Sequence, residues 1–141
     1  MENKPLIIEQ TLAASAENVW KAITQKEQMD QWYFSISSFK PEVGFKFQFE
    51  GGDEAKSIHL CKVIEVIPGK KLAYTWQYEK VEGISVVTFE LFAEGDKTKV
   101  KLSHSGLETF PDDNPDFSRA SFADGWAYII GTSLKEFVES R

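Results

Sequence analysis

Alternation of hydrophobic and polar residues dominates the middle of the chain and predicts β-strands. In residues 97–105, Val100, Leu102 and His104 alternate with lysines and serines, which is typical of a strand with one buried face. Short turns separate five such segments in succession, so we expect an antiparallel meander. With an N-terminal strand opened by Pro5, the predicted strands cover residues 6–12, 45–50, 57–67, 71–78, 84–93 and 97–105.

Two short helices are predicted between the first and second strands. Ser15 is a suitable N-cap, and Val19, Trp20 and Ile23 follow at the spacing of one helical face. A second helix is expected over residues 26–32.

A long helix is predicted at the C-terminal end of the chain. Residues 114–116 (Asn-Pro-Asp) form a helix-start signal, and the helical pattern continues to Glu139. Two glycines interrupt the pattern, and we interpret Gly125 as a point where the helix approaches its neighbour closely. The apolar stripe consists of Phe122, Trp126, Ile129, Ile130, Ser133, Leu134 and Phe137.

The order of these elements predicts an α+β fold. The sheet is the only large apolar surface that could cover the stripe of the long helix. We therefore expect a six-stranded curved antiparallel sheet wrapped around the C-terminal helix, with two short helices between strands 1 and 2. No linker or repeat divides the sequence, so residues 1–141 are expected to form a single domain.

Composition and charge exclude several classes of function. The chain carries 16 Lys and Arg against 22 Asp and Glu, and this net charge of -6 argues against nucleic-acid binding. A single cysteine, Cys61, excludes a disulfide scaffold. No apolar run is long enough to span a membrane, and no signal peptide is visible, so we expect a cytoplasmic protein.

Several segments, taken in order, resemble the SRPBCC superfamily and within it the branch named for the activator of the heat-shock-protein-90 ATPase. Each motif is weak by itself, but their order and spacing together are fairly specific. One departure is the single Gly44 at the entry to the second strand. The matching segments are residues 16–24 (AENVWKAIT), 31–33 (QWY), 63–76 (VIEVIPGKKLAYTW), 98–106 (TKVKLSHSG) and 125–126 (GW) with Leu134.

The resemblance implies the helix-grip fold, also described as START-like or birch-pollen-allergen-like. It further implies a deep cavity between the sheet and the long helix, which many members use for hydrophobic or amphipathic small molecules. Some relatives catalyse cyclisation or dehydration in that cavity. The eukaryotic namesake contains a related domain that assists a chaperone.

Aromatic residues are the main candidates for the lining of such a cavity. They make up 13% of the chain, and each one alone could simply fill a core. Together they could line an apolar pocket in which the polar tips of Tyr and Trp orient a ligand. The candidate ligand-binding residues are Trp32, Phe45, Phe47, Phe49, His59, Tyr74, Trp76, Tyr78, Phe89, His104, Phe122, Trp126 and Ile130.

Catalysis and metal binding have less support in the sequence. It contains no nucleophile elbow, phosphate-binding glycine loop or zinc-protease motif. His59 and His104 could meet Cys61 inside the fold, but a metal site needs three or four convergent ligands, so we expect no metal and no cofactor. Glu65 and Glu90 could act as inward acids, although positions facing solvent suit both better.

Three functional hypotheses follow. The favoured one is a binding protein for an apolar or amphipathic small molecule, rather than an enzyme. The first alternative is an enzyme of the cyclase or dehydratase kind, which needs two ionisable groups converging on one substrate position. The second is a chaperone-associated interaction protein, which needs an exposed apolar patch.

Overall fold

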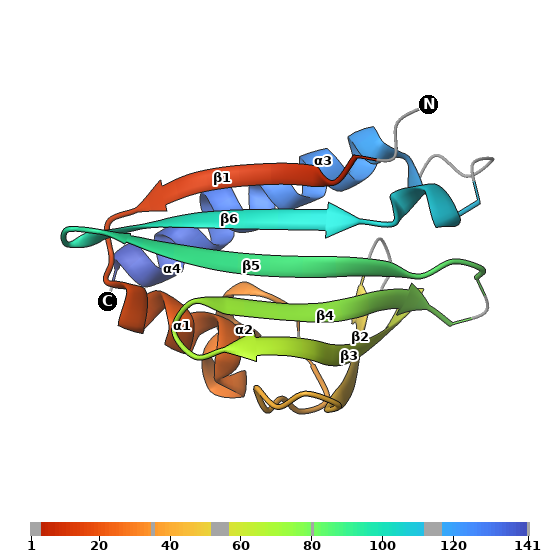
Figure 1. The fold of residues 1–141 in the computed structure, drawn as a ribbon, viewed down its shortest axis with the longest axis horizontal. Coiled ribbons are helices and arrows are strands. Elements are labelled where there is room, and N and C mark those ends of the chain that lie inside the picture. The colour runs from red at the N-terminus through yellow and green to blue at the C-terminus, as the bar shows by residue number, and fades with distance from the viewer. Residues whose placement is uncertain (1–3, 35, 52–56, 80, 112–116, 141) are drawn as a thin grey trace.

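The structure is a computed structural model that describes residues 4–34, 36–51, 57–79, 81–111 and 117–140. A six-stranded antiparallel sheet has the strand order β1-β6-β5-β4-β3-β2 (Figure 1). All six predicted strands are confirmed to within one residue at each end. The strands are β1 (Leu6–Leu12), β2 (Lys46–Gly51), β3 (Ser57–Ile67), β4 (Lys71–Tyr78), β5 (Ser85–Glu94) and β6 (Lys97–Ser105).

The two short helices between β1 and β2 are also confirmed. They are α1 (Ala16–Thr24) and α2 (Lys26–Trp32). The Ser15 hydroxyl accepts a hydrogen bond from the Asn18 amide at 3.1 Å, which is the N-cap that the sequence predicts. A short 3-10 turn, η2 (Leu107–Thr109), follows β6.

The C-terminal helix is made of α3 (Arg119–Tyr128), the π-helical turn η4 (Ile129–Leu134) and α4 (Lys135–Glu139). The predicted start at residues 114–116 lies outside the described residues. The α-helix itself begins at Arg119, where Ser118 is the N-cap and accepts from the Ser121 amide at 3.1 Å. None of the described helices is long and apolar enough to cross a membrane.

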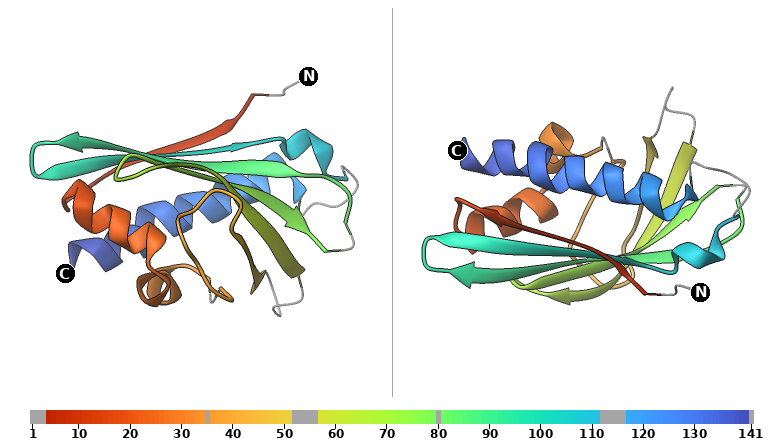
Figure 2. Two further views of the ribbon diagram at one scale, coloured as in Figure 1. Left: turned by 60° about the horizontal axis from the view of Figure 1, so that its bottom comes forward. Right: turned by 90° about the horizontal axis from the view of Figure 1, so that it is seen from above.

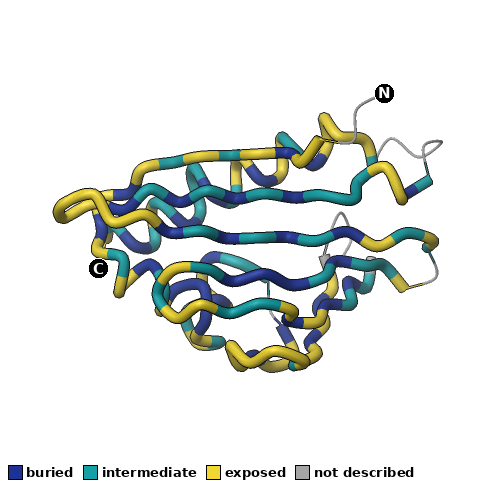
Figure 3. The backbone as a smooth tube through the Cα atoms, viewed as in Figure 1, coloured by how far each residue is buried: buried dark blue, intermediate teal, exposed yellow. Residues whose placement is uncertain are grey.

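The C-terminal helix lies across the concave face of the sheet, and α1 packs beside it against β5 and α4 (Figure 2). Buried residues alternate with more exposed ones along the strands, as the two-residue period requires (Figure 3). The core therefore lies between the sheet and its helices, and the opposite face of the sheet carries the polar positions.

The π-helical turn keeps the apolar side of the long helix on the sheet. Its buried residues recur every fourth position, and four residues of an α-helix turn about 40° too far to stay on one face. The wider turn at Ile129–Leu134 offsets this drift. The predicted apolar stripe is wrong at its C-terminal end. Val138 is buried there, whereas the predicted Phe137 is only half-buried. The buried residues are Phe122, Trp126, Ile130, Leu134 and Val138.

The interpretation of Gly125 as a point of close approach is wrong. Gly125 is exposed, and a Cβ atom added there would have no heavy atom within 4 Å. Successive residues of a helix lie about 100° apart around its axis. Because the neighbouring Trp126 faces the sheet, Gly125 faces away from it. Gly131 makes an ordinary contact, with its added Cβ 3.5 Å from the side-chain oxygen of Gln10.

Candidate ligand-binding site

The concave face of the sheet carries a cluster of aromatic rings beneath the C-terminal helix. Its members come from β2 to β6 and from α3, because inward positions recur at every second residue of each strand. Trp76 of β4 contacts rings on three sides, with centroid distances of 4.9 Å to His59, 5.5 Å to His104 and 5.4 Å to Trp126. These separations are those of directly packed aromatic rings.

The segment after α2 adds two more rings that connect the sheet with the helix. Phe34 stacks on Phe49 at 4.5 Å, with the planes 12° apart. Phe49 stacks in the same way on His59 at 4.5 Å. The ring of Tyr33 lies between the sheet and the helix. Its centroid is 5.9 Å from that of Phe49 and 6.4 Å from that of Trp126. Tyr33 and Phe34 are both half-buried, so they form the partly exposed margin of the cluster.

His104 is held in one tautomer by a chain of hydrogen bonds. Trp126 Nε1 can only donate, and it donates to His104 Nδ1 at 2.9 Å. The proton of the neutral imidazole is therefore on Nε2, which donates to Ser85 Oγ at 2.8 Å. Ser85 Oγ donates in turn to the carbonyl oxygen of Trp76 at 2.9 Å. Because Nε2 donates, His104 does not act as a base for Ser85, and the pair is not an activated nucleophile.

Two further pairs of polar groups meet inside the cluster. The hydroxyls of Tyr33 and Tyr74 share a hydrogen bond of 2.7 Å. Trp76 Nε1 donates to the hydroxyl of Tyr78 at 3.0 Å. These bonds join aromatic side chains to each other, so the polar atoms of the cluster are satisfied within it.

Four ionisable groups of the cluster, His104, Tyr33, Tyr74 and Cys61, are uncharged at neutral pH. Burial lowers the pKa of His104 to about 3. Burial raises the pKa of Tyr33 well above its ordinary value, and the neighbouring Tyr74 raises it further. The pKa values of Tyr74 and Cys61 are also raised, chiefly by burial. These four groups thus offer hydrogen-bond donors and acceptors without offering a charge.

The predicted ligand-binding residues all belong to this inner layer. Phe45 and Tyr78 are half-buried and lie at its margin. Trp32 is anchored elsewhere, because its Nε1 donates to the Ala22 carbonyl of α1 at 2.8 Å. Their contact with a ligand stays a prediction. The buried members are Trp32, Phe47, Phe49, His59, Tyr74, Trp76, Phe89, His104, Phe122, Trp126 and Ile130.

Sequence reasoning missed several members of the cluster. Tyr33 and Phe34 follow a helix and lie in an irregular segment, where no periodicity indicates which way a side chain points. Their one signal is the run of three aromatic residues that begins at Trp32. Ser85 was also missed, because a small polar residue at the start of a strand is an ordinary feature. Phe117 was missed as well, although its ring lies 4.9 Å from that of Tyr78.

The acidic candidates do not enter the cluster. Glu65 forms an ion pair with Lys71 at 3.2 Å, and both side chains are partly exposed. Glu90 lies opposite Lys101 in the register of β5 and β6, on the outer face of the sheet. Among the described residues, no group of three His, Cys, Asp or Glu side chains is arranged to hold a metal ion.

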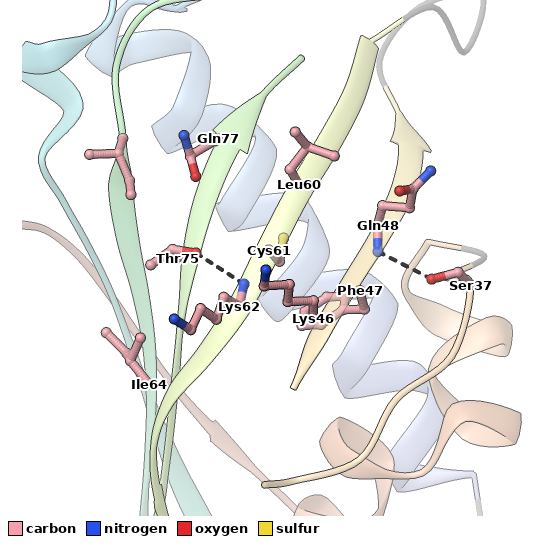
Figure 4. Close-up of a pocket in the computed structure, with 11 residues that line it drawn as sticks. Ser37, Lys46, Phe47, Gln48, Leu60, Cys61, Lys62, Ile64, Thr75 and Gln77 are labelled. Carbon is pink, nitrogen blue, oxygen red and sulfur yellow. Dashed lines mark hydrogen bonds between the residues drawn. The ribbon is translucent and has the colours of Figure 1, made fainter. Parts of the chain in front are cut away.

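The rings of the cluster are in contact with each other, so the deep internal cavity stays a prediction. A hollow of about 640 Å³ does occur, but it lies on the other face of the sheet, over β2, β3 and β4 (Figure 4). Phe47 and Cys61 border this hollow, and both residues are buried in the inner layer. The other side chains around it point outward.

Comparison with known proteins agrees with this architecture. A family model described as "Activator of Hsp90 ATPase homolog 1-like protein" matches residues 13–139, which is nearly the whole chain. No protein of curated function matches the sequence significantly.

Three solved structures are similar to the chain in fold. DynU16, a protein of the dynemicin biosynthetic locus, has a TM-score of 0.81 at 20% identity, covering 99% of this chain and 48% of DynU16. The chain therefore spans about half the length of DynU16. MLL2253 from Mesorhizobium loti has a TM-score of 0.76 at 26% identity, covering 97% and 98%. CalU16 from Micromonospora echinospora has a TM-score of 0.74 at 23% identity, covering 95% and 75%.

Proposed function

Because the chain belongs to the family of activator of Hsp90 ATPase homolog 1-like proteins, we propose that it binds an apolar or amphipathic small molecule between the curved sheet and the C-terminal helix. The observation that carries the proposal is the pairing of polar tips inside the aromatic cluster. A core built only for stability needs apolar volume, and each buried polar group adds a desolvation cost. Here hydroxyl, indole and imidazole groups meet between the centre and the margin of the cluster, where they could orient a ligand.

The chemistry of the cluster limits what it would bind. His104, Tyr33 and Tyr74 are uncharged at neutral pH, so a charged group placed among them would lose its hydration without gaining a counter-ion. The part of the ligand inside the fold is therefore uncharged. Flat apolar groups suit the stacked rings, and a hydroxyl or carbonyl suits the hydrogen-bonding tips. A charged end, if the ligand has one, would stay at the margin.

A ligand would take the place of side chains that are now in contact. Tyr33 and Phe34 are the side chains best placed to leave, because they are half-buried and lie between α2 and β2 rather than within a strand. Their departure would separate the Tyr33 hydroxyl from that of Tyr74, which lies 2.7 Å away. The freed Tyr74 hydroxyl could then bond to the ligand.

An enzyme of the cyclase or dehydratase kind remains the first alternative. Acid–base catalysis needs a group that exchanges protons near the working pH. The pKa of His104 near 3 and the raised pKa values of Tyr33 and Tyr74 disfavour these three side chains for that work. Binding without catalysis is therefore the stronger proposal.

A chaperone-associated role is the second alternative, in keeping with the family description. Such a role needs an exposed apolar patch. On the outer face of β6 the side chains are those of Lys97, Lys99, Lys101 and Ser103, and Lys99 lies over the exposed Phe92 ring at 5.5 Å. This part of the surface suits solvent better than a partner. The cytoplasmic location stays a prediction.

A fluorescence titration with the neutral apolar dye Nile red would test the proposed function. We expect saturable, blue-shifted binding to the folded protein. Phe34→Ala should strengthen binding several-fold, because the side chain that must move is gone. Trp126→Ala should weaken it about tenfold or more, in a variant shown by circular dichroism to be folded.

Trp20→Phe is the matched control, because Trp20 lies on α1 and is only half-buried. Its dye affinity should equal that of the unmodified protein. Absence of saturable binding in both the unmodified protein and the Phe34→Ala variant would overturn the proposal. A native mass spectrum of protein purified from its own host would identify a retained ligand directly.

A further inference from the structure

The hollow on the outer face of the sheet contains two lysines in direct opposition. Lys46 of β2 and Lys62 of β3 are cross-strand partners in the antiparallel register. Both point outward, because their neighbours Phe47 and Cys61 are buried on the inner face (Figure 4). Directly opposed like charges destabilise a pair of strands. The folded protein therefore places two positive charges together at an energetic cost.

Neither lysine is neutralised by its surroundings. Among the described residues, Lys46 and Lys62 take part in no ion pair, whereas Lys71 at the start of β4 pairs with Glu65 of β3 at 3.2 Å. The chain as a whole has a net charge of -6, so acidic residues are plentiful elsewhere. A pair of unneutralised ammonium groups is what an anion-binding site requires.

Aliphatic side chains lie beside the lysines in the same hollow. Leu60 and Ile64 flank Lys62 along β3, each about 7 Å away at a two-residue step. Ile64 of β3 is 42% exposed, and Ile84, which directly precedes β5, is 47% exposed, so both offer apolar surface to a ligand. The hollow thus combines aliphatic side chains with two lysines that lie between them.

The remaining walls are polar but uncharged. Gln48 and Gln77 face Leu60 from the strands on either side. The Thr75 hydroxyl accepts a hydrogen bond from the Lys62 amide at 3.0 Å, which holds β3 and β4 together beside the lysine. The Ser37 segment closes the far side, because its amide donates to the Gln48 carbonyl at 3.0 Å. Backbone segments that are held in place by hydrogen bonds therefore form these two sides of the hollow.

We propose that this outer hollow binds an amphipathic carboxylate, such as a free fatty acid. Its carboxylate lies between Lys46 and Lys62, and its hydrocarbon chain extends over the aliphatic side chains on one side of them. The volume of about 640 Å³ is within the range of small-molecule sites. A bound carboxylate relieves the repulsion between the two lysines, and this relief favours binding of the ligand's charged group. This site is separate from the aromatic cluster, because it uses the opposite face of the sheet.

Isothermal titration calorimetry with dodecanoate would test the proposal. We expect saturable binding of dodecanoate, at least about tenfold weaker binding of the uncharged dodecanol, and no binding of inorganic phosphate. The double variant Lys46→Gln/Lys62→Gln should lose at least about tenfold in dodecanoate affinity. Without ligand, the same variant should unfold at a higher temperature, because the repulsion is gone.

The matched control is Lys101→Gln on β6, which removes an outward lysine of the same sheet away from the hollow. Its affinity for dodecanoate should be unchanged. No binding of dodecanoate, equal binding of dodecanol, or unchanged affinity in the double variant would each overturn the proposal. The Nile red test of the inner site is independent, because Trp126→Ala should leave dodecanoate binding at the lysines intact.

Discussion

Trp126 Nε1 and His104 Nδ1 lie 2.9 Å apart, and this hydrogen bond joins the C-terminal helix to the strand β6. His104 continues the connection to Ser85 of β5, which bonds the backbone of Trp76 in β4. A helix and three strands are thus linked through buried polar atoms. Hydrogen bonds shielded from water are costly to break, so this series of bonds should help to fix the C-terminal helix in one position on the sheet.

The buried imidazole predicts how stability depends on pH. The pKa of His104 is about 3 in the folded protein and near its ordinary value of 6.5 in the unfolded chain. Between these values the unfolded state binds more protons, so the free energy of unfolding falls as the pH falls. His104 should contribute its full stability above pH 6.5 and lose up to about 1.4 kcal/mol per pH unit below it.

Urea unfolding at about pH 7, 6 and 5 would measure this loss, with His104→Gln as the control. The variant keeps the carboxylates, whose titration also changes stability at low pH, but it lacks the imidazole. For each protein, the free energy of unfolding is plotted against pH. The difference between the slopes of the two proteins is therefore the contribution of His104. Equal slopes, or an imidazole proton resonance of His104 that titrates near pH 6.5, would contradict the assignment of a neutral buried ring.

Ser85→Ala tests the middle of the same hydrogen-bonded chain. The substitution removes the acceptor for His104 Nε2 and the donor to the Trp76 carbonyl oxygen, and both groups remain buried. We expect a loss of about 1–3 kcal/mol in the free energy of unfolding, measured by denaturant titration. Ser103→Ala on the outer side of β6 is the control and should cost less than about 0.5 kcal/mol. A loss as small as that of the control would show that this chain of hydrogen bonds adds little stability.

Local patterns were sufficient to predict the strands of this fold. The strand Lys97–Ser105 was predicted with its observed bounds because each residue alternates between a buried and a solvated face. That alternation is a property of the sequence itself, and it also placed His104 and Trp76 on the inner side. The relation between sheet and helix followed from the order of the elements, because the sheet is the only large apolar surface that could cover the stripe of the helix.

Other features depend on packing between distant segments and could not be predicted. The π-helical turn at Ile129–Leu134 keeps Ile130 and Leu134 on the buried side, and the apolar spacing of its sequence, IIGTSL, predicted only a continuing helix. The tautomer of His104 depends on Trp126, which is 22 residues away. The opposition of Lys46 and Lys62 follows from the register of β2 and β3, which the separate strand patterns do not determine.

Two glycines should respond oppositely to substitution by alanine. Gly125 lies in α3, and an added Cβ would meet no heavy atom within 4 Å. Gly125→Ala should raise the free energy of unfolding by about 0.5–1 kcal/mol, because alanine favours the helix. Gly106 has a φ of 84°, and an added Cβ would lie 2.9 Å from the Ile84 carbonyl oxygen. Gly106→Ala should therefore lower the free energy of unfolding.

Thermal unfolding followed by circular dichroism would measure both glycine variants under the same conditions. An increase in melting temperature for Gly125→Ala and a decrease for Gly106→Ala are expected. A decrease for Gly125→Ala would mean that the helix does pack closely at this position, which is the interpretation that the structure rejects.

The thiol of Cys61 should be inert in the folded protein. Its side chain is 4% exposed, and burial raises its pKa, so little of the reactive thiolate is present. The reaction with a chromogenic aromatic disulfide near pH 8 should be at least about a hundredfold slower in the folded protein than in guanidinium chloride. The double variant Cys61→Ala/Ser37→Cys is the control, because Ser37 is exposed beside the outer hollow, and its thiol should react promptly. Prompt reaction of Cys61 itself would show that reagents pass between β2 and β3, and the inner cluster would then be open to the outer face.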